Sequence, residues 1–325
     1  MPELRSWLDT LAAAQPQTDG RRITHFTDRD AELAAVDAGL PGMTPLTTLG
    51  VIAVRGDAAL AFLHGQLSAD LRAMTSGQTV LTAWCSPKGR VVFLLRVVVT
   101  DDGFRLLLPL DQIAACVKRL RLFVLRAAVE IEDRSAAEGV LLLRGLAANA
   151  SLPETLCSGG TPELCWCVGS LRDIGEAWPT FAIAPCGEDA AALDAIRRGL
   201  PVLDHSLADE FLPQELNLDY LAGVSFEKGC YPGQEIVARV RFRGTVKRRL
   251  ARLSGDPGTP AASGSRVCGV GSEQAVGTVL DCVRIADESV ELLAVLRVDA
   301  EAIYLAGSPG SLLRRQPLPE PSATP

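Results

Sequence analysis

The sequence predicts an α+β protein with two ferredoxin-like α+β domains followed by a C-terminal β-barrel. Strand and helix patterns alternate up to residue 199, with a break near Gly139. From Leu250 onward, Gly and Pro instead punctuate short apolar strands, and no helix pattern is visible. We therefore divide the chain into an extension, two α+β domains, a barrel and a tail, at residues 1–45, 46–136, 137–245, 246–318 and 319–325.

The first 42 residues are poorly patterned. They contain two short helix patterns, Trp7–Ala14 and Asp28–Ala38, and Pro41-Gly42 ends the second. A loosely packed extension is one interpretation of this segment.

The first α+β domain has the clearest pattern. Two helices present apolar sides, formed by Leu60, Phe62, Leu63, Leu67 and Leu71 in one and by Ile113, Val117, Leu120 and Val124 in the other. Strand patterns surround them, at Thr47–Arg55, Thr79–Cys85, Arg90–Thr100, Phe104–Pro109 and Val129–Ile131. A turn at Ser86–Gly89 joins two of these strands. We interpret the order as β-α-β-β-α-β, the split βαβ arrangement.

The second α+β domain is less regular. We expect strands at Val140–Leu143, Leu164–Val168 and Thr180–Ala184, and helices at Leu146–Ser151 and Glu188–Gly199. The stretches Leu152–Thr161 and Gly169–Glu176 are predicted to be loops. A long irregular segment, Val202–Phe226, follows, and a loop of this length is uncommon unless it has a function.

The barrel is predicted from four short apolar strands. They are Leu250–Leu253, Val276–Ile285, Val290–Val298 and Ala302–Leu305. Residues 309–325 are polar and Pro-rich.

Composition limits the classes of partner. The chain has 325 residues, 48% of them hydrophobic, and a net charge of −7. Bulk electrostatics therefore do not attract it to nucleic acid or to an anionic membrane, and direct nucleic-acid binding is not expected. The apolar runs are too short to span a bilayer, and the N-terminus does not resemble a signal peptide. We expect no membrane association.

The nine Cys residues are odd in number and scattered, and the chain has three His. No pair of Cys-x-x-Cys motifs occurs, so we predict no metal site. Free thiols are typical of a reduced compartment, and the expected location is the cytoplasm.

The candidate site is the stretch 226–250, FEKGCYPGQEIVARVRFRGTVKRRL. Pro232-Gly233 is a turn dipeptide, and Gly229 permits a second bend. Cys230 is therefore predicted to lie on a loop as a reactive thiol. The alternative is that it is a small buried hydrophobe. Lys228 and the arginines that follow favour its thiolate form, while Glu227 and Glu235 oppose it.

The second half of this stretch alternates. Ala238, Val240 and Phe242 alternate with Arg239, Arg241 and Arg243, which predicts a strand carrying three guanidinium groups on one face. Such a face is either simply solvated or a site for an anionic ligand.

The motif KGCYPGQE, followed by VARVRFRG and KRR, resembles the signature of the YgfZ family of folate-binding proteins, which is related to the aminomethyltransferase (T-protein) of the glycine cleavage system. Two further stretches resemble that family. One is His64–Asp70 with the Cys85–Gly89 turn, and the other runs from Gly199-Leu200-Pro201 to Leu212–Asp219.

The resemblance implies three domains in a ring around a central, folate-sized opening. It implies a tetrahydrofolate-type cofactor and a role in assembling or repairing iron–sulfur client proteins, including enzymes that modify tRNA. Cys230 corresponds to the residue most closely tied to that role. The predicted ligand-binding residues around it are Asn217, Lys228, Tyr231, Gln234, Glu235, Arg239, Arg241 and Arg243.

The chain departs from the relatives in two places. In the aminomethyltransferases an Asp faces the folate from the strand after the first hairpin, whereas Arg90–Leu95 contains no acid to serve as a general acid or base. Glycine-cleavage activity is therefore not expected. Arg197-Arg198 also stands where we expect the Glu that pairs with the pterin ring, and this departure leaves the folate form open.

Four functions follow from these patterns. The first is a folate-binding accessory protein for iron–sulfur or tRNA-modification pathways. The second is a folate-dependent one-carbon transferase. The third is a scaffold whose arginines bind an acidic protein or RNA. The fourth is nucleophilic catalysis by Cys230 with His64 or His205.

Overall fold

The structure is a computed structural model, which describes residues 2–147, 152–271, 274–285, 287–308 and 310–320. Contacts divide the chain into two compact units, each built from separate segments. Unit 1 comprises residues 1–66, 70–81 and 95–191. Unit 2 comprises residues 67–69, 82–94 and 192–325.

The first predicted domain forms a five-stranded sheet with the order β5-β6-β7-β4-β8. Its strands are β4 (Leu49–Arg55), β5 (Thr79–Cys85), β6 (Val91–Thr100), β7 (Gly103–Pro109) and β8 (Glu130–Asp133). All five predicted strands are confirmed. The sheet has one strand more than the β-α-β-β-α-β pattern, and β5 lies at its edge. The end of β5, the 86–89 turn and the start of β6 belong to unit 2.

Two helices accompany this sheet, α3 (Ala59–Gln66) and α4 (Ile113–Val124), the latter preceded by the 3-10 turn η2 (Leu110–Gln112). Ile113, Val117 and Leu120 are buried, as predicted. The prediction for α3 was wrong in part. Leu60 is 39% exposed, and Leu67 and Leu71 are buried beyond the end of the helix.

A second, four-stranded sheet of unit 1 has the order β10-β11-β9-β3. Its strands are β3 (Gly42–Pro45), β9 (Glu138–Arg144), β10 (Cys157–Thr161) and β11 (Leu164–Ser170), and the three pairings are antiparallel. The N-terminal residues form α1 (Pro2–Thr10), η1 (Ala12–Ala14), β1 (Gln17–Thr18), β2 (Ile23–His25) and α2 (Arg29–Asp37).

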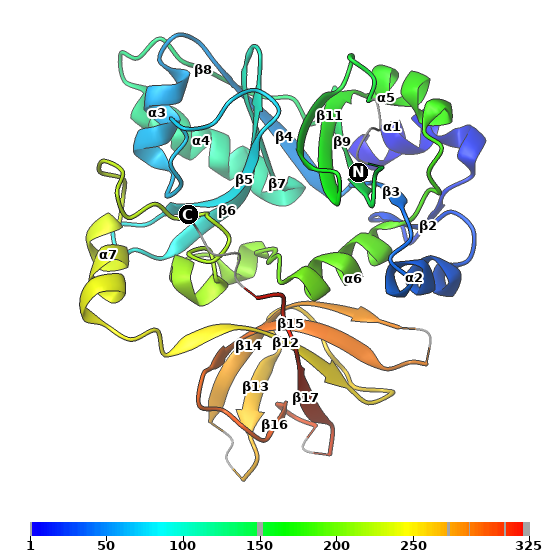
Figure 1. The fold of residues 1–325 in the computed structure, drawn as a ribbon, viewed down its shortest axis with the longest axis vertical. Helices are drawn as coiled ribbons and strands as arrows, with labels where there is room; N and C mark the ends of the chain where they lie inside the picture. Colours follow the sequence, from blue (N-terminus) through cyan, green and yellow to red (C-terminus); the bar gives the residue numbers. More distant parts are fainter. Residues whose placement is uncertain (1, 148–151, 272–273, 286, 309, 321–325) are drawn as a thin grey trace. The chain divides into compact units, whose positions relative to one another are not determined.

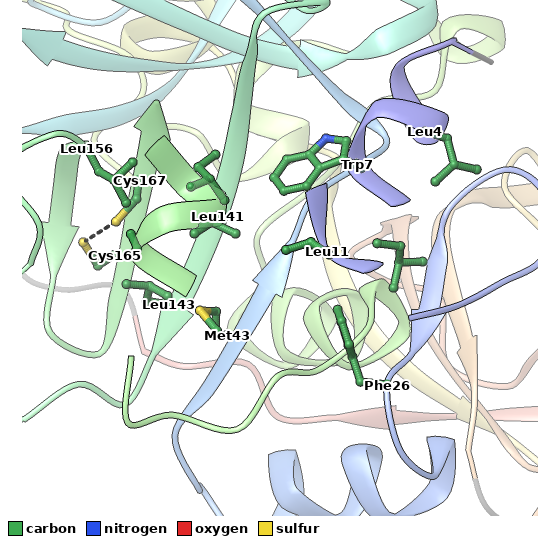
Figure 2. Packing of buried hydrophobic residues seen from close by; sticks show 13 residues of the cluster. Leu4, Trp7, Leu11, Phe26, Met43, Leu141, Leu143, Leu156, Cys165 and Cys167 are labelled. Carbon is green, nitrogen blue, oxygen red and sulfur yellow. Dashed lines mark hydrogen bonds between the residues drawn. The ribbon is translucent and has the colours of Figure 1, made fainter. Parts of the chain in front are cut away.

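The N-terminal segment is packed and not loose. Leu4, Trp7 and Leu11 of its first helical region are buried in one cluster with Leu141 and Leu143 of β9 (Figure 2). Gly139 permits this contact, because a Cβ there would come within 2.3 Å of the Trp7 ring. The loosely packed interpretation was therefore wrong.

Other predictions for this region were also wrong. Residues 180–184 form no strand, since η3 (Trp178–Thr180) leads only to an isolated bridge at Pro185. The predicted loop 169–176 contains α5 (Leu171–Ala177), and the predicted loop 152–161 contains β10. The predicted helix 146–151 falls mostly on residues 148–151, outside the described residues, and Leu146 and Ala147 are not helical.

Helix α6 (Glu188–Arg198) is confirmed, and Gly199, which follows its last residue, has φ 67°. The segment after it is irregular, as predicted, and contains only the 3-10 turns η4 (His205–Leu207) and η5 (Pro213–Leu216). Helix α7 (Gln234–Arg243) then replaces the predicted arginine strand.

Unit 2 ends in a closed barrel with the order β12-β15-β14-β13-β16-β17 (Figure 1). Its strands are β12 (Arg248–Gly255), β13 (Arg266–Gly269), β14 (Ala275–Arg284), β15 (Val290–Arg297), β16 (Ile303–Leu305) and β17 (Leu312–Gln316). The barrel prediction is confirmed. Strands β13 and β17 were missed, and part of the predicted tail, 321–325, lies outside the described residues.

Candidate functional site

Cys230 lies on the loop between the irregular segment and α7, and its side chain is exposed. The other eight thiols differ from it. Six are buried, and Cys157 and Cys282 are intermediate. The loop position predicted for Cys230 is therefore confirmed, and burial as a small hydrophobe is ruled out. The thiol is open to a reagent or a partner molecule.

The loop is fixed from inside by Lys228. The Lys228 ammonium is buried and donates hydrogen bonds to the carbonyl oxygens of Leu67 (2.7 Å) and Ala69 (2.9 Å). We expected Lys228 to be a ligand contact and a cation flanking the thiol. Its charge is instead directed at backbone carbonyls, and its observed role is to hold the loop.

Two buried hydroxyl groups complete this anchor. The Ser68 hydroxyl donates to the Gly223 carbonyl (2.6 Å), and the Thr82 hydroxyl donates to the same oxygen (3.1 Å). The Ser225 amide in turn donates to the Ser68 carbonyl. The stretch 67–69 is thus bonded to both ends of the segment that leads to Cys230.

The turn after Cys230 packs against the 86–89 hairpin turn. Gly233 has φ 80°, and a Cβ on it would lie 2.4 Å from the Ser86 carbonyl oxygen. Gly89 has φ 73°, and a Cβ on it would lie 2.9 Å from Cβ of Ile236. Both turns need glycine, because side chains are strained at these angles and no space remains for them. The two motifs are therefore one structural feature.

Tyr231 points inward beside the exposed thiol. It is 6% exposed, and its hydroxyl has no hydrogen-bond partner among the described residues. Burial and the Cys85 thiol raise the pKa of Tyr231 well above its usual range. Burial likewise raises the pKa of Cys85 to about 12, with Asp209 adding to the effect. Tyr231 is thus a neutral phenol with a free hydroxyl.

The remaining loop residues have different roles. The Gln234 amide donates to the Lys228 carbonyl (3.2 Å) and closes the loop on itself. Glu235 is exposed in the first turn of α7. The Asn217 Oδ1 accepts a hydrogen bond from Arg249 (3.5 Å), whose guanidinium also pairs with Asp219 (2.6 Å). Gln234 and Asn217, predicted as ligand contacts, therefore make internal contacts.

The arginines lie on a helix, so the predicted face of three guanidinium groups was wrong. Arg239 and Arg243 are four residues apart and share one side of α7, whereas Arg241 points elsewhere. The Arg241 guanidinium lies 5.5 Å from the centre of the Phe226 ring. All three are exposed, and none makes an ion pair with a described residue.

The two histidines considered for a dyad lie in different settings. His64 is buried, with Nδ1 3.4 Å from an Asp70 carboxylate oxygen, and His205 is exposed. His205 and Cys230, both in unit 2, share no hydrogen bond within the described ranges, and His64 belongs to unit 1. Arg197 forms a bidentate ion pair with Glu291, which Arg252 shares.

Ser68 and Thr82 were missed as site residues. Ser68 lies in the stretch His64–Asp70, whose resemblance to the family could have indicated it, whereas no sequence pattern indicated Thr82.

Within the described residues, no three His, Cys, Asp or Glu side chains form a metal-binding group. No helix in the described part of the chain has the length and apolar character needed to cross a membrane.

Comparison with known proteins gives one consistent group of relatives. The chain is 33% identical over 299 residues to the tRNA-modifying protein YgfZ of Edwardsiella ictaluri, which covers 82% of this chain and 89% of that protein. It is 30% identical over 319 residues to the protein of the same name from Escherichia coli O127:H6, covering 90% and 98%. No protein-family model matches the sequence.

Among solved structures, the chain is similar to the glycine cleavage system aminomethyltransferase T from Bartonella henselae. The TM-score is 0.76 at 14% identity, and the match covers 97% of this chain and 96% of that one. At this identity the likeness shows a common fold.

Proposed function

The chain belongs to the family of tRNA-modifying proteins named YgfZ, and from that premise we propose that it is a folate-binding accessory protein that supports iron–sulfur cluster assembly or repair, and thereby tRNA modification. The observation that carries the proposal is Cys230, an exposed thiol on a loop held by buried contacts. A thiol presented in this way suits contact with a cluster or a client protein, because the loop keeps its shape when the sulfur is engaged.

Tetrahydrofolate, when bound, would supply a carrier for one-carbon units. The exposed arginines of α7 suit the carboxylates of its glutamate tail, since guanidinium and carboxylate groups form charge-assisted hydrogen bonds. The buried Tyr231 hydroxyl, which lacks a partner among the described residues, is a further candidate contact. At the pterin end the fit is poorer, because Arg197 replaces the expected acid and is paired with Glu291.

A one-carbon transferase is disfavoured. Residues 91–95 of β6 are all apolar, so no carboxylate is available there to assist transfer.

The first test is isothermal titration with tetrahydrofolate. We expect the intact protein to bind, and the double variant Arg239→Ala/Arg243→Ala to bind more weakly, with the larger loss at low salt. A control variant, Lys118→Ala/Arg119→Ala, removes two exposed cations from α4 and should bind as the native protein does. Absence of binding at millimolar tetrahydrofolate would exclude the folate part of the proposal.

The second test concerns the thiol. In cells that lack the native protein, Cys230→Ser should fail to restore tRNA modification, and Cys282→Ser, at a half-buried thiol of the barrel, should restore it. Iodoacetamide should also label Cys230 faster than the other eight thiols. Full complementation by Cys230→Ser would remove the thiol from the proposed function.

A further inference from the structure

Arg96 is a cation that has no counter-charge among the described residues of unit 1. It lies on β6, and its guanidinium carbon is 4.2 Å from the centre of the Trp166 ring on β11. Among the described residues, it forms no hydrogen bond and no ion pair. Its Nε and the Trp166 Nε1 are both shielded from solvent and unbonded. Two N–H donors on neighbouring side chains, Arg96 Nε and Trp166 Nε1, therefore lack an acceptor in the part of the chain that the structure describes.

Arg105, on the neighbouring strand β7, shows what a buried arginine normally requires. Its Nε donates to Glu138 (2.9 Å), and its two terminal nitrogens donate to Asp102 (3.0 and 3.1 Å). Arg96 has no such acid, and burial lowers its pKa to about 10. A partly buried charge without a counter-charge is costly, so the surroundings of Arg96 are suited to an anion that arrives from outside.

The surroundings also limit the kind of anion. Arg96 shares a face of β6 with Val98 and pairs in register with Leu107, and both belong to an apolar cluster that also holds Leu142. Trp166 packs against the same cluster. Arg96 and Trp166 each remain partly exposed, so a small molecule can reach them. The position therefore combines one positive charge, shielded N–H donors and an apolar wall.

We propose that Arg96 and Trp166 form a binding site for the carboxylate of a small organic anion whose remaining part is apolar. A carboxylate carries one charge, which one arginine neutralises, and its two oxygens match the guanidinium edge. A phosphate dianion would leave one charge uncompensated beside the apolar cluster. The proposal does not depend on folate binding or on Cys230.

The test uses benzoate as the probe and benzamide as its neutral counterpart. Benzoate should raise the melting temperature of the intact protein and change its tryptophan fluorescence, and benzamide should do neither. Arg96→Met should lose the benzoate response and should melt at a higher temperature than the native protein without ligand, because it removes a partly buried charge that has no counter-charge among the described residues. Arg126→Met, at an exposed arginine after α4, should keep the response.

Arg96→Lys keeps the test decisive if the Met variant does not fold. It retains the positive charge but cannot form the bidentate hydrogen bonds of a guanidinium group, so its benzoate response should weaken several-fold. Equal responses to benzoate and benzamide, a response retained in Arg96→Met, or a response to inorganic phosphate alone would each overturn the proposal. Binding of benzoate without binding of tetrahydrofolate would support this site and exclude the folate proposal.

Discussion

Cys230 and the Cys165–Cys167 pair place thiols in opposite settings. Cys165 and Cys167 lie two residues apart on β11, with their sulfur atoms 4.0 Å apart inside a hydrophobic cluster (Figure 2). Cys230 lies on a loop in unit 2 with its sulfur exposed. In the strand, the thiols are part of the packing. In the loop, Lys228, Ser68 and Thr82 hold the backbone, and the exposed thiol is not part of the core packing.

The buried thiols contribute to the stability of their region, whereas the exposed thiol of Cys230 is available for reaction. The pKa of Cys167 is raised by its hydrogen bond with Cys165 and by burial, so the Cys167 thiol keeps its proton while the strand is folded. The loop divides the two tasks between neighbouring residues, with Lys228 inside and Cys230 outside. Substitutions should therefore affect stability at Lys228 and Cys167, and function at Cys230.

The largest effect is expected for Lys228→Met. The change leaves two buried carbonyl oxygens without a donor and should lower the free energy of unfolding by roughly 2–4 kcal/mol. Lys118→Met, at an exposed site on α4, is the control and should stay within about 0.5 kcal/mol. Urea unfolding measures both. Equal stability of the two variants would mean that the loop is not anchored by its lysine.

Cys167→Ser should come next. A hydroxyl in place of a fully buried thiol adds a polar group to the cluster and should cost about 1–3 kcal/mol. The same urea experiment applies, with Cys167→Ala to separate polarity from lost volume. If the Ser variant were as stable as the Ala variant, polarity at this site would not matter.

We expect the buried thiol of Cys85 to contribute to the pH dependence of protein stability. Its pKa is about 12 in the folded protein against 9.0 for the ordinary thiol, so the folded state retains the proton longer. The contribution of Cys85 to the free energy of unfolding is therefore fully present below pH 9 and is lost as the pH rises toward 12. We expect Cys85 to account for about 1 kcal/mol of stability lost between pH 9 and pH 10. In Cys85→Ala this part of the loss should be missing. An unchanged pH profile would contradict the assignment.

Cys230→Ser should have the smallest effect on stability, within about 0.5 kcal/mol, because the thiol is exposed and makes no packing contact that the fold needs. A loss above 1 kcal/mol in urea unfolding would contradict the contrast with Cys167.

The sequence predicted the strands of the first sheet, the barrel and the exposed loop, since each depends on local patterns. It failed at α7, where alternation over residues 238–243 indicated a strand. Glu235 in the first turn and Arg241 and Arg243 in the last suit the dipole of a helix, although the β-branched Ile236, Val237 and Val240 between them favour a strand. It also failed at Lys228, whose partners lie about 160 residues earlier and leave no local trace.

That separation has a consequence for synthesis on the ribosome. Lys228 and Leu67 are 161 positions apart, so the carbonyl groups of residues 67–69 leave the ribosome long before their lysine exists. At about 5–20 residues per second, the wait is roughly 8–32 s. For most of this interval, until residue 192 is made, residues 67–69 and 82–94 of unit 2 must stay available within a nascent chain otherwise made of unit 1. The geometry around Cys230 is therefore completed late in translation, and a protein truncated before residue 228 cannot form it.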